Sequence, residues 1–215
     1  MLKKEKENVI ISKSWLNRIT RLADIIFATS MTMLLLAIDL PRVEDISSNT
    51  ELIKGFSNQL PILGIFLSTF VLLAVYWLKH TATTRLMKGA DTMYMWLDLL
   101  MLAFVALLPF SNSLATAFPE YYIAQSAYCI NVFVIGSISF YAWRHASKND
   151  HLLKEHIEPK EAEEISSDSW MEPLIAIISL VFGYFFVEYT QLPFILVPII
   201  YGLRTKWVEK RKKAH

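Results

Sequence analysis

Two long apolar runs without a formal charge constrain this chain more than any other feature of its sequence. They span residues 60–78 and 121–143. At about 1.5 Å per helical residue, each run is long enough to cross a hydrocarbon core of about 30 Å. Hydrophobic residues make up 54% of the 215-residue chain and charged residues only 19%, which excludes an ordinary soluble domain. The sequence therefore predicts an integral membrane protein.

Further apolar segments complete the predicted spans. Residues 93–110 form one that contains Asp98, and residues 22–40 form another that contains Asp24. Two shorter segments, typical of a final helical hairpin, are residues 173–187 and 192–203. We expect an all-α integral membrane protein with six transmembrane helices. The first helix is the expected insertion signal, because the polar lead before it lacks the pattern of a cleaved signal peptide.

The charged segments predict that both termini face the cytoplasm. Lys and Arg outnumber acids before the first span, after the second span and in the C-terminal tail, as the positive-inside rule requires of cytoplasmic segments. The loop between the fourth and fifth spans is acidic, but acids carry little weight in that rule. The expected organisation is a cytoplasmic N-terminal segment (1–21), a four-helix transmembrane part (22–143), an acidic cytoplasmic loop (144–171), a transmembrane hairpin (172–204) and a basic cytoplasmic tail (205–215).

The acidic loop and the basic tail each allow two interpretations. The loop is either a ligand or ion sensor or, as charge-rich segments usually are, a solvated stretch. The tail either binds anionic lipid or only fixes the topology.

Four polar residues are expected at one depth in the membrane. Because consecutive spans run in opposite directions, the cytoplasmic ends of the first three helices bring together Asp24, Trp77, His80 and Asp98. A carboxylate inside a bilayer is costly unless it is paired or lines an aqueous path. The candidate partners at this depth are Arg18, Arg21, Lys79 and His80. This layer either braces the three helices or serves an ion path.

One face of the first helix combines hydroxyl and apolar side chains. Residues at three- and four-residue steps share a helix face, and this face comprises Ile25, Thr29, Thr32, Leu36 and Asp39, with Met33 assigned to the same lining. Hydroxyls and a rim acid suit a water-filled lumen, so the pattern predicts a membrane pore or carrier. Alternatively, each threonine bonds back to its own helix and serves packing or a kink. A central pore lined by one short helix per chain would require an oligomer.

No dense catalytic or metal-binding constellation is present in the sequence. It lacks a zinc-binding histidine pair, a phosphate-binding glycine loop and a nucleophile elbow, and its five histidines are scattered. The single cysteine, Cys129, is expected to be a packing residue. We expect neither an enzyme nor a bound cofactor or metal centre, and no nucleic acid partner.

Four short segments follow patterns of one known family. Arg18-Ile-Thr-Arg-Leu-Ala-Asp24 is similar to an Arg-x-x-x-Phe-Ser-Asp signature at the cytoplasmic start of a first helix. The ends of the first three helices are similar in Ala37-Ile-Asp-Leu-Pro41, Tyr76-Trp-Leu-Lys-His80 and Leu107-Leu-Pro-Phe110. With these segments the chain resembles the transmembrane protein 175 family of potassium channels, of the prokaryotic six-helix type. The likeness covers residues 18–143, and residues 173–203 agree only in pattern.

The resemblance implies a cation leak channel without a voltage sensor. Prokaryotic members of the family assemble four six-helix chains around a pore lined by the first helix. They constrict this pore with bulky aliphatic side chains rather than with a carbonyl-lined filter, and selection by pore radius and lining chemistry is physically reasonable there. Potassium is the permeant species that the resemblance implies.

The chain departs from the family pattern in two places. Leu22 and Ala23 stand where the signature has Phe and Ser, which removes a hydroxyl from the layer around the signature aspartate. Thr29 stands where the family places its aliphatic constriction. The remaining candidates for the constriction are Ile25, Met33 and Leu36.

The leading interpretation is a homotetrameric, potassium-permeable channel of a prokaryotic plasma membrane, with lipid and potassium ions as its partners. Two other functions stay open. Asp24, His80 and Asp98 could form a proton-conducting or proton-coupled path, because acid and histidine relays are a common proton route. A non-conducting membrane adaptor that binds a partner through the acidic loop and the basic tail is the third.

Overall fold

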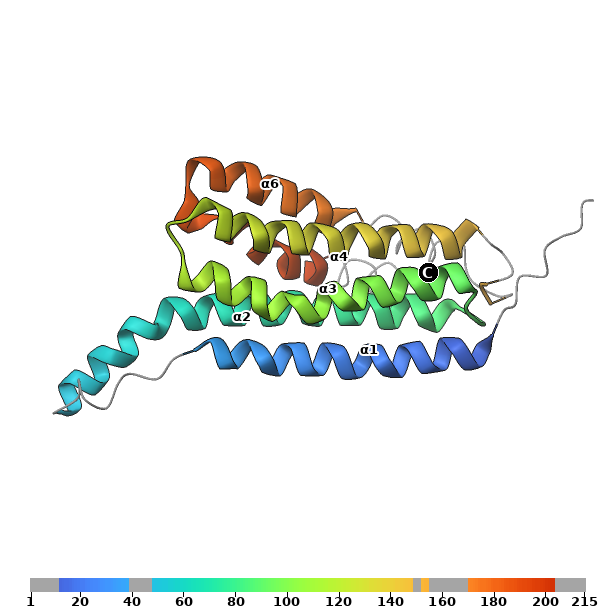
Figure 1. Cartoon of the computed structure of the whole chain (residues 1–215), viewed down its shortest axis with the longest axis horizontal. Helices are drawn as coiled ribbons and strands as arrows, with labels where there is room; N and C mark the ends of the chain where they lie inside the picture. Colours follow the sequence, from blue (N-terminus) through green and yellow to red (C-terminus); the bar gives the residue numbers. More distant parts are fainter. Residues whose placement is uncertain (1–11, 39–47, 149–151, 155–169, 204–215) are drawn as a thin grey trace, which may run out of the picture.

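The computed structural model describes residues 12–38, 48–148, 152–154 and 170–203, and every regular element in these ranges is a helix. Four long helices lie side by side in antiparallel succession (Figure 1): α1 (Lys13–Met33), α2 (Asn49–Leu86), α3 (Thr92–Ala117) and α4 (Tyr122–Lys148). α1 ends in a 3-10 turn, η1 (Leu34–Ala37). All four long helices are long and apolar enough to cross a membrane. The all-helical membrane class predicted from the sequence is therefore confirmed.

The C-terminal part of the bundle is built from shorter helices. α6 (Met171–Phe185) packs against α4 (Figure 1), and it is followed by the 3-10 turns η3 (Val187–Tyr189) and η4 (Leu192–Ile195). Helical backbone then continues over residues 196–203. These segments occupy the predicted hairpin, while the count of six spans stays a prediction.

α1 begins at Lys13 rather than at residue 22, the predicted start of the first span. Ser12 caps the helix, since its side chain accepts a hydrogen bond of 3.2 Å from the backbone N–H of Trp15. Leu16 and Ile19 are buried, so the packed face extends before the apolar run. The helix therefore begins before the predicted span, because the first turns of α1 are amphipathic and an apolar run does not include them.

α2 is also longer than the predicted span of residues 60–78, with 38 residues. Ser48 caps it by accepting a hydrogen bond of 3.3 Å from the backbone N–H of Glu51. At 1.5 Å per residue the helix is about 57 Å long, well beyond a hydrocarbon core of about 30 Å. Its first third projects from the bundle (Figure 1), with the apolar side chains of Ile53 and Phe56 exposed. Half of the predicted loop after the first span is therefore helix.

Other predicted segment boundaries differ by a few residues. α3 continues to Ala117 through a predicted loop, and residues 144–148 of the predicted acidic loop are the last turn of α4. Apolar periodicity does not mark these ends, because the terminal turns are polar. Residues 149–151 and 155–169 of the acidic loop, the tail 205–215 and residue 39 lie outside the described residues.

Close packing and buried polar contacts hold the helices together. A Cβ at Gly136 of α4 would lie 2.8 Å from Cδ of Pro173 on α6, so this glycine permits the close approach of the two helices. Between α2 and α3, the buried hydroxyl of Thr69 donates to Oδ1 of Asn112 at 2.9 Å. Hydrogen bonds of this kind join helices where water is absent.

Backbone hydrogen bonds tie three chain segments together at one end of the bundle. The residues after α2 pair with Ser12, just before α1, through Ala90 N–H at 3.2 Å and Ala90 C=O at 3.0 Å. The same stretch pairs with the segment after α4, since Lys88 N–H donates to Leu152 C=O at 2.9 Å and Lys154 N–H to Leu86 C=O at 3.0 Å. The start of α1 and the ends of α2 and α4 are thereby fixed relative to one another.

Candidate functional site

α1 has two faces with different environments. One face packs into the bundle, and its buried residues are Leu16, Ile19, Ala23, Phe27 and Ser30, followed by Leu34 of η1. Together they recur at three- and four-residue steps, as a helix face buried along its whole length requires. The opposite face of α1 has no covering element in the described part of the chain.

The uncovered face carries the residues predicted to line a pore. Ile25 is 63% exposed, Met33 49% and Leu36 77%, and Thr29 and Thr32 are exposed as well. The hydroxyl of Thr32 donates to the backbone C=O of Thr29 at 2.8 Å. The bond is internal to α1, as expected if the threonines serve packing or a kink. The hydroxyl oxygen still lies on the exposed face of the helix. Asp39, predicted at the outer rim, is outside the described residues.

The structure brings Asp24 of the signature segment to α2. Its Oδ1 accepts a hydrogen bond of 2.8 Å from the indole Nε1 of Trp77. Ala23 is fully buried, while Leu22 is 39% exposed. Arg18 is exposed and forms no ion pair within the described ranges, so it does not join this contact. α1 and α2 are therefore linked by one charge-assisted hydrogen bond at this depth.

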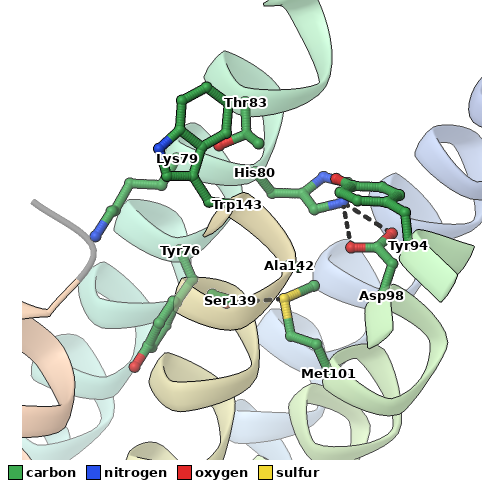
Figure 2. Close-up of a pocket in the computed structure, with 10 residues that line it drawn as sticks. All are labelled: Tyr76, Lys79, His80, Thr83, Tyr94, Asp98, Met101, Ser139, Ala142 and Trp143. Carbon is green, nitrogen blue, oxygen red and sulfur yellow. Dashed lines mark hydrogen bonds and ion pairs between the residues drawn. The ribbon is translucent and has the colours of Figure 1, made fainter. Parts of the chain in front are cut away.

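The other two residues of the predicted layer form a second pair. Nε2 of His80 donates to both carboxylate oxygens of Asp98, at 3.0 and 3.1 Å (Figure 2). Both side chains are buried, with 5% and 2% exposure. The ring of Phe27 on α1 lies 6.2 Å from the His80 ring, centroid to centroid. Asp98 of α3 and His80 of α2 thus sit against the packed face of α1.

The structure also contains two ion pairs that the sequence analysis did not find. Nζ of Lys79 donates to Oε1 of Glu172 at 2.6 Å, and Glu172 is 1% exposed. Nε2 of His145 lies 2.7 Å from Oδ2 of Asp91. Lys79 was considered only as a partner for the acids of the first three helices. The sequence did contain a signal for the Lys79–Glu172 pair. Glu172 begins the fifth predicted span, and the predicted topology places this start at the same depth as the end of the second span.

A small cavity of about 30 Å³ adjoins the His80–Asp98 pair. Figure 2 shows that it lies among α2, α3 and α4, with Tyr94 and Trp143 on its walls. Nδ1 of His80 and Nε1 of Trp143 are buried and have no hydrogen-bond partner among the described residues. The cavity has room for one water molecule. The buried polar atoms and the water-sized cavity therefore form a polar site inside a single bundle.

A multi-pass bundle of apolar helices, with polar pairs in its interior and one mixed polar and apolar helix face uncovered, is an architecture found among membrane channels and carriers. Comparison with known proteins defines it further. The model of the family described as "Endosomal/lysosomal potassium channel TMEM175" matches residues 18–109. Over these residues the chain is similar to the TMEM175 family of ion channels.

Individual relatives match over different shares of their length. A potassium channel of Chamaesiphon minutus is 24% identical over 191 residues, which are 87% of this chain and 94% of the relative. The endosomal/lysosomal proton channel TMEM175 of Mus musculus is 25% identical over 144 residues, which are 65% of this chain but only 28% of the mouse protein. A crystal structure of a lysosomal potassium-selective channel TMEM175 homolog from Chamaesiphon minutus superposes with a TM-score of 0.76 at 22% identity. It covers 89% of this chain and 98% of that one.

Proposed function

We propose that the chain is a potassium-permeable cation leak channel in which four copies surround a pore lined by α1. The observation that carries this proposal is the uncovered face of α1, on which Ile25, Thr32 and Leu36 are exposed while the opposite face is packed. An isolated helix face with hydroxyls and apolar residues needs either lipid or a second copy against it. Relatives named as potassium channels support a second copy rather than lipid against this face.

The constriction of this pore is hydrophobic rather than a ring of backbone carbonyls. Leu36 is the most exposed large apolar side chain among the described residues of α1 and η1, and Ile25, about three turns before it, is the next most exposed. Rings of such side chains narrow a pore and can expel water from it. Thr29 and Thr32 line the segment between them, Met33 lies beside it, and Asp39 stands at its outer mouth. Selectivity for potassium then depends on pore radius at the aliphatic rings.

The proposed topology has six spans with both termini in the cytoplasm, in the plasma membrane of a prokaryote. Lys and Arg at the start of α1 and at the end of α2 support this orientation. The contact of Asp24 with Trp77 and the pair of His80 with Asp98 brace the inner ends of α1, α2 and α3. No cofactor is required, because the permeant ion is the only ligand of a leak pore.

Ion flux from liposomes that contain only the purified protein tests the proposal. Potassium flux should exceed sodium flux, and Leu36→Ala should raise total flux and lower the preference for potassium because it widens the ring. Ile130→Ala is the matched control, since Ile130 is also an exposed aliphatic residue, on α4. Absence of flux for both ions from folded, inserted protein contradicts the proposal and favours the membrane adaptor.

A proton path is the second candidate function. The buried His80–Asp98 pair beside a water-sized cavity favours it, and several animal relatives are named proton channels. This path would make flux steeply dependent on pH, and Asp24→Asn or Asp98→Asn would abolish that dependence. If potassium flux persists with an unchanged pH profile in both variants, these acids brace the helices and carry no protons.

A further inference from the structure

The projecting first third of α2 carries an apolar stripe on one side. Its four apolar side chains are all exposed, by between 38% and 67%: Leu52, Ile53, Phe56 and Leu60. Residues at these spacings fall within about 100° of one another around a helix. The exposed side chains of Lys54 and Asn58 lie on the opposite side of the same turns. This part of α2 is therefore amphipathic.

Most of the stripe lies beyond the part of α2 that fits a hydrocarbon core. The charge-free run 60–78 is long enough to cross a core of about 30 Å. The residues of α2 before this run, 49–59, include the charged residues Glu51 and Lys54, and charged residues are costly inside the core. Acyl chains therefore do not account for an apolar stripe at this position, and exposed apolar patches outside the core mark interaction surfaces.

The segment that joins η1 to α2 offers the stripe little apolar surface. This segment, residues 39–47, lies outside the described residues. Four of its nine residues are charged, namely Asp39, Arg42, Glu44 and Asp45. Its composition suits contact with water better than cover for four apolar side chains.

The direction of the projecting part indicates where a partner would lie. Figure 1 shows that the first third of α2 is set at an angle to the rest of the helix. Pro61 lies inside α2, and a proline bends a helix because it removes a backbone hydrogen bond. The projecting part runs past the end of α1, toward the side away from α3 and α4 (Figure 1). The uncovered face of α1 is turned to the same side, since its packed face contacts α3.

We propose that the apolar stripe of α2 packs against a second copy of this chain. The inference rests on the proposed function, in which the uncovered faces of four α1 helices surround a pore. A helix that extends toward this side reaches over the outer mouth of the pore, where neighbouring copies are present and acyl chains are not. Each copy of a symmetric oligomer makes the same contact. The four projecting parts would then form a collar around the outer mouth, with Lys54 and Asn58 facing water.

Photo-cross-linking of the purified full-length protein in phosphatidylcholine liposomes tests this contact. The photoreactive amino acid p-benzoylphenylalanine replaces Phe56 in the test variant and Asn58 in the matched control, on the opposite side of the same helix. Only this chain and lipid are present, so a product of twice the chain's mass on a denaturing gel contains a second copy. Light scattering of each variant in detergent before reconstitution measures the mass of the oligomer.

We expect the double-mass product to be severalfold stronger with the probe at position 56 than at position 58. Mass spectrometry identifies the partner of each cross-link. A cross-link from position 56 only to lipid or to residues 39–47 of the same chain overturns the proposal, and so do equal double-mass products at the two positions. With the mass of four chains, such a result removes the collar and leaves the proposed pore intact. The mass of one chain contradicts both.

Discussion

At the scale of single residues, the pair of His80 and Asp98 has the greatest energetic consequence. Both side chains are buried and bond to each other at 3.0 Å. Removal of one partner leaves an uncompensated charge in a medium that cannot solvate it, which costs about 3–5 kcal/mol. His80→Leu should therefore lower the free energy of unfolding by about this amount, measured by denaturant titration in detergent.

The double variant is the control for this prediction. His80→Leu/Asp98→Leu removes both polar groups and should cost less than His80→Leu alone, because no buried charge is left. If the loss of unfolding free energy in the double variant equals the sum of the losses in the two single variants, the two side chains do not stabilise each other.

Gly136 provides a second prediction at this scale. Alanine normally stabilises a helix relative to glycine by roughly 0.5–1 kcal/mol, but here its Cβ would lie 2.8 Å from the rigid ring of Pro173. Gly136→Ala should lower the thermal midpoint. Gly64→Ala on α2 is the matched control and should raise it, since nothing lies within 4 Å of the new Cβ. A rise for both variants would show that α6 yields to the added methyl group.

At the scale of elements, the uncovered face of α1 decides between a pore and a lipid contact. In a Cys129→Ala background, a water-soluble methanethiosulfonate reagent should react with Thr32→Cys and reduce ion flux severalfold. Water reaches a pore-lining thiol and ionises it, whereas a thiol in lipid stays protonated and inert. Ile130→Cys on α4 should not react. Equal reaction at both positions would contradict the assignment of α1 to the pore.

The order of the helices and the starts of α3 and α4 could be predicted from the sequence, but the starts of α1 and α2 could not. Charge-free runs mark the middle of α2 and all of α4 except residues 144–148, because only the hydrocarbon core demands such runs. The first turns of α1 and of α2 are polar, and their caps at Ser12 and Ser48 leave no signal in hydropathy. Helix ends outside the membrane follow capping and packing, which an apolar run does not reveal.

The sequence predicted that the polar residues of the site lie at one level of the bundle, but it did not predict which of them form pairs. Alternating helix direction placed Asp24, Trp77, His80 and Asp98 at one level, and the structure joins them as two pairs. Lys79 instead contacts Glu172 of α6, a helix that packs against α4. Side-chain packing across the whole bundle determines which helices are neighbours. The spacing of residues along one helix does not reveal these neighbours.

At the scale of the whole molecule, the proposed pore requires several copies of the bundle. Four copies should form the conducting unit, with a protein mass in detergent of about four times the 24.8 kDa of one chain. Light scattering corrected for bound detergent measures this mass. A protein that conducts ions with the mass of one chain would contradict a pore formed between subunits.

The hydrogen bonds that tie Ser12 to Ala90 also set the stiffness of α1. One end of the helix is clamped to the chain after α2, while the other loosens into the 3-10 turn of Leu34–Ala37, whose hydrogen bonds have poorer geometry. The start of α1 is held by backbone hydrogen bonds in addition to packing, whereas η1 is held by packing, through the buried side chain of Leu34. The proposed aliphatic ring at Leu36 therefore lies at the end of α1 that no backbone hydrogen bond to another described segment restrains.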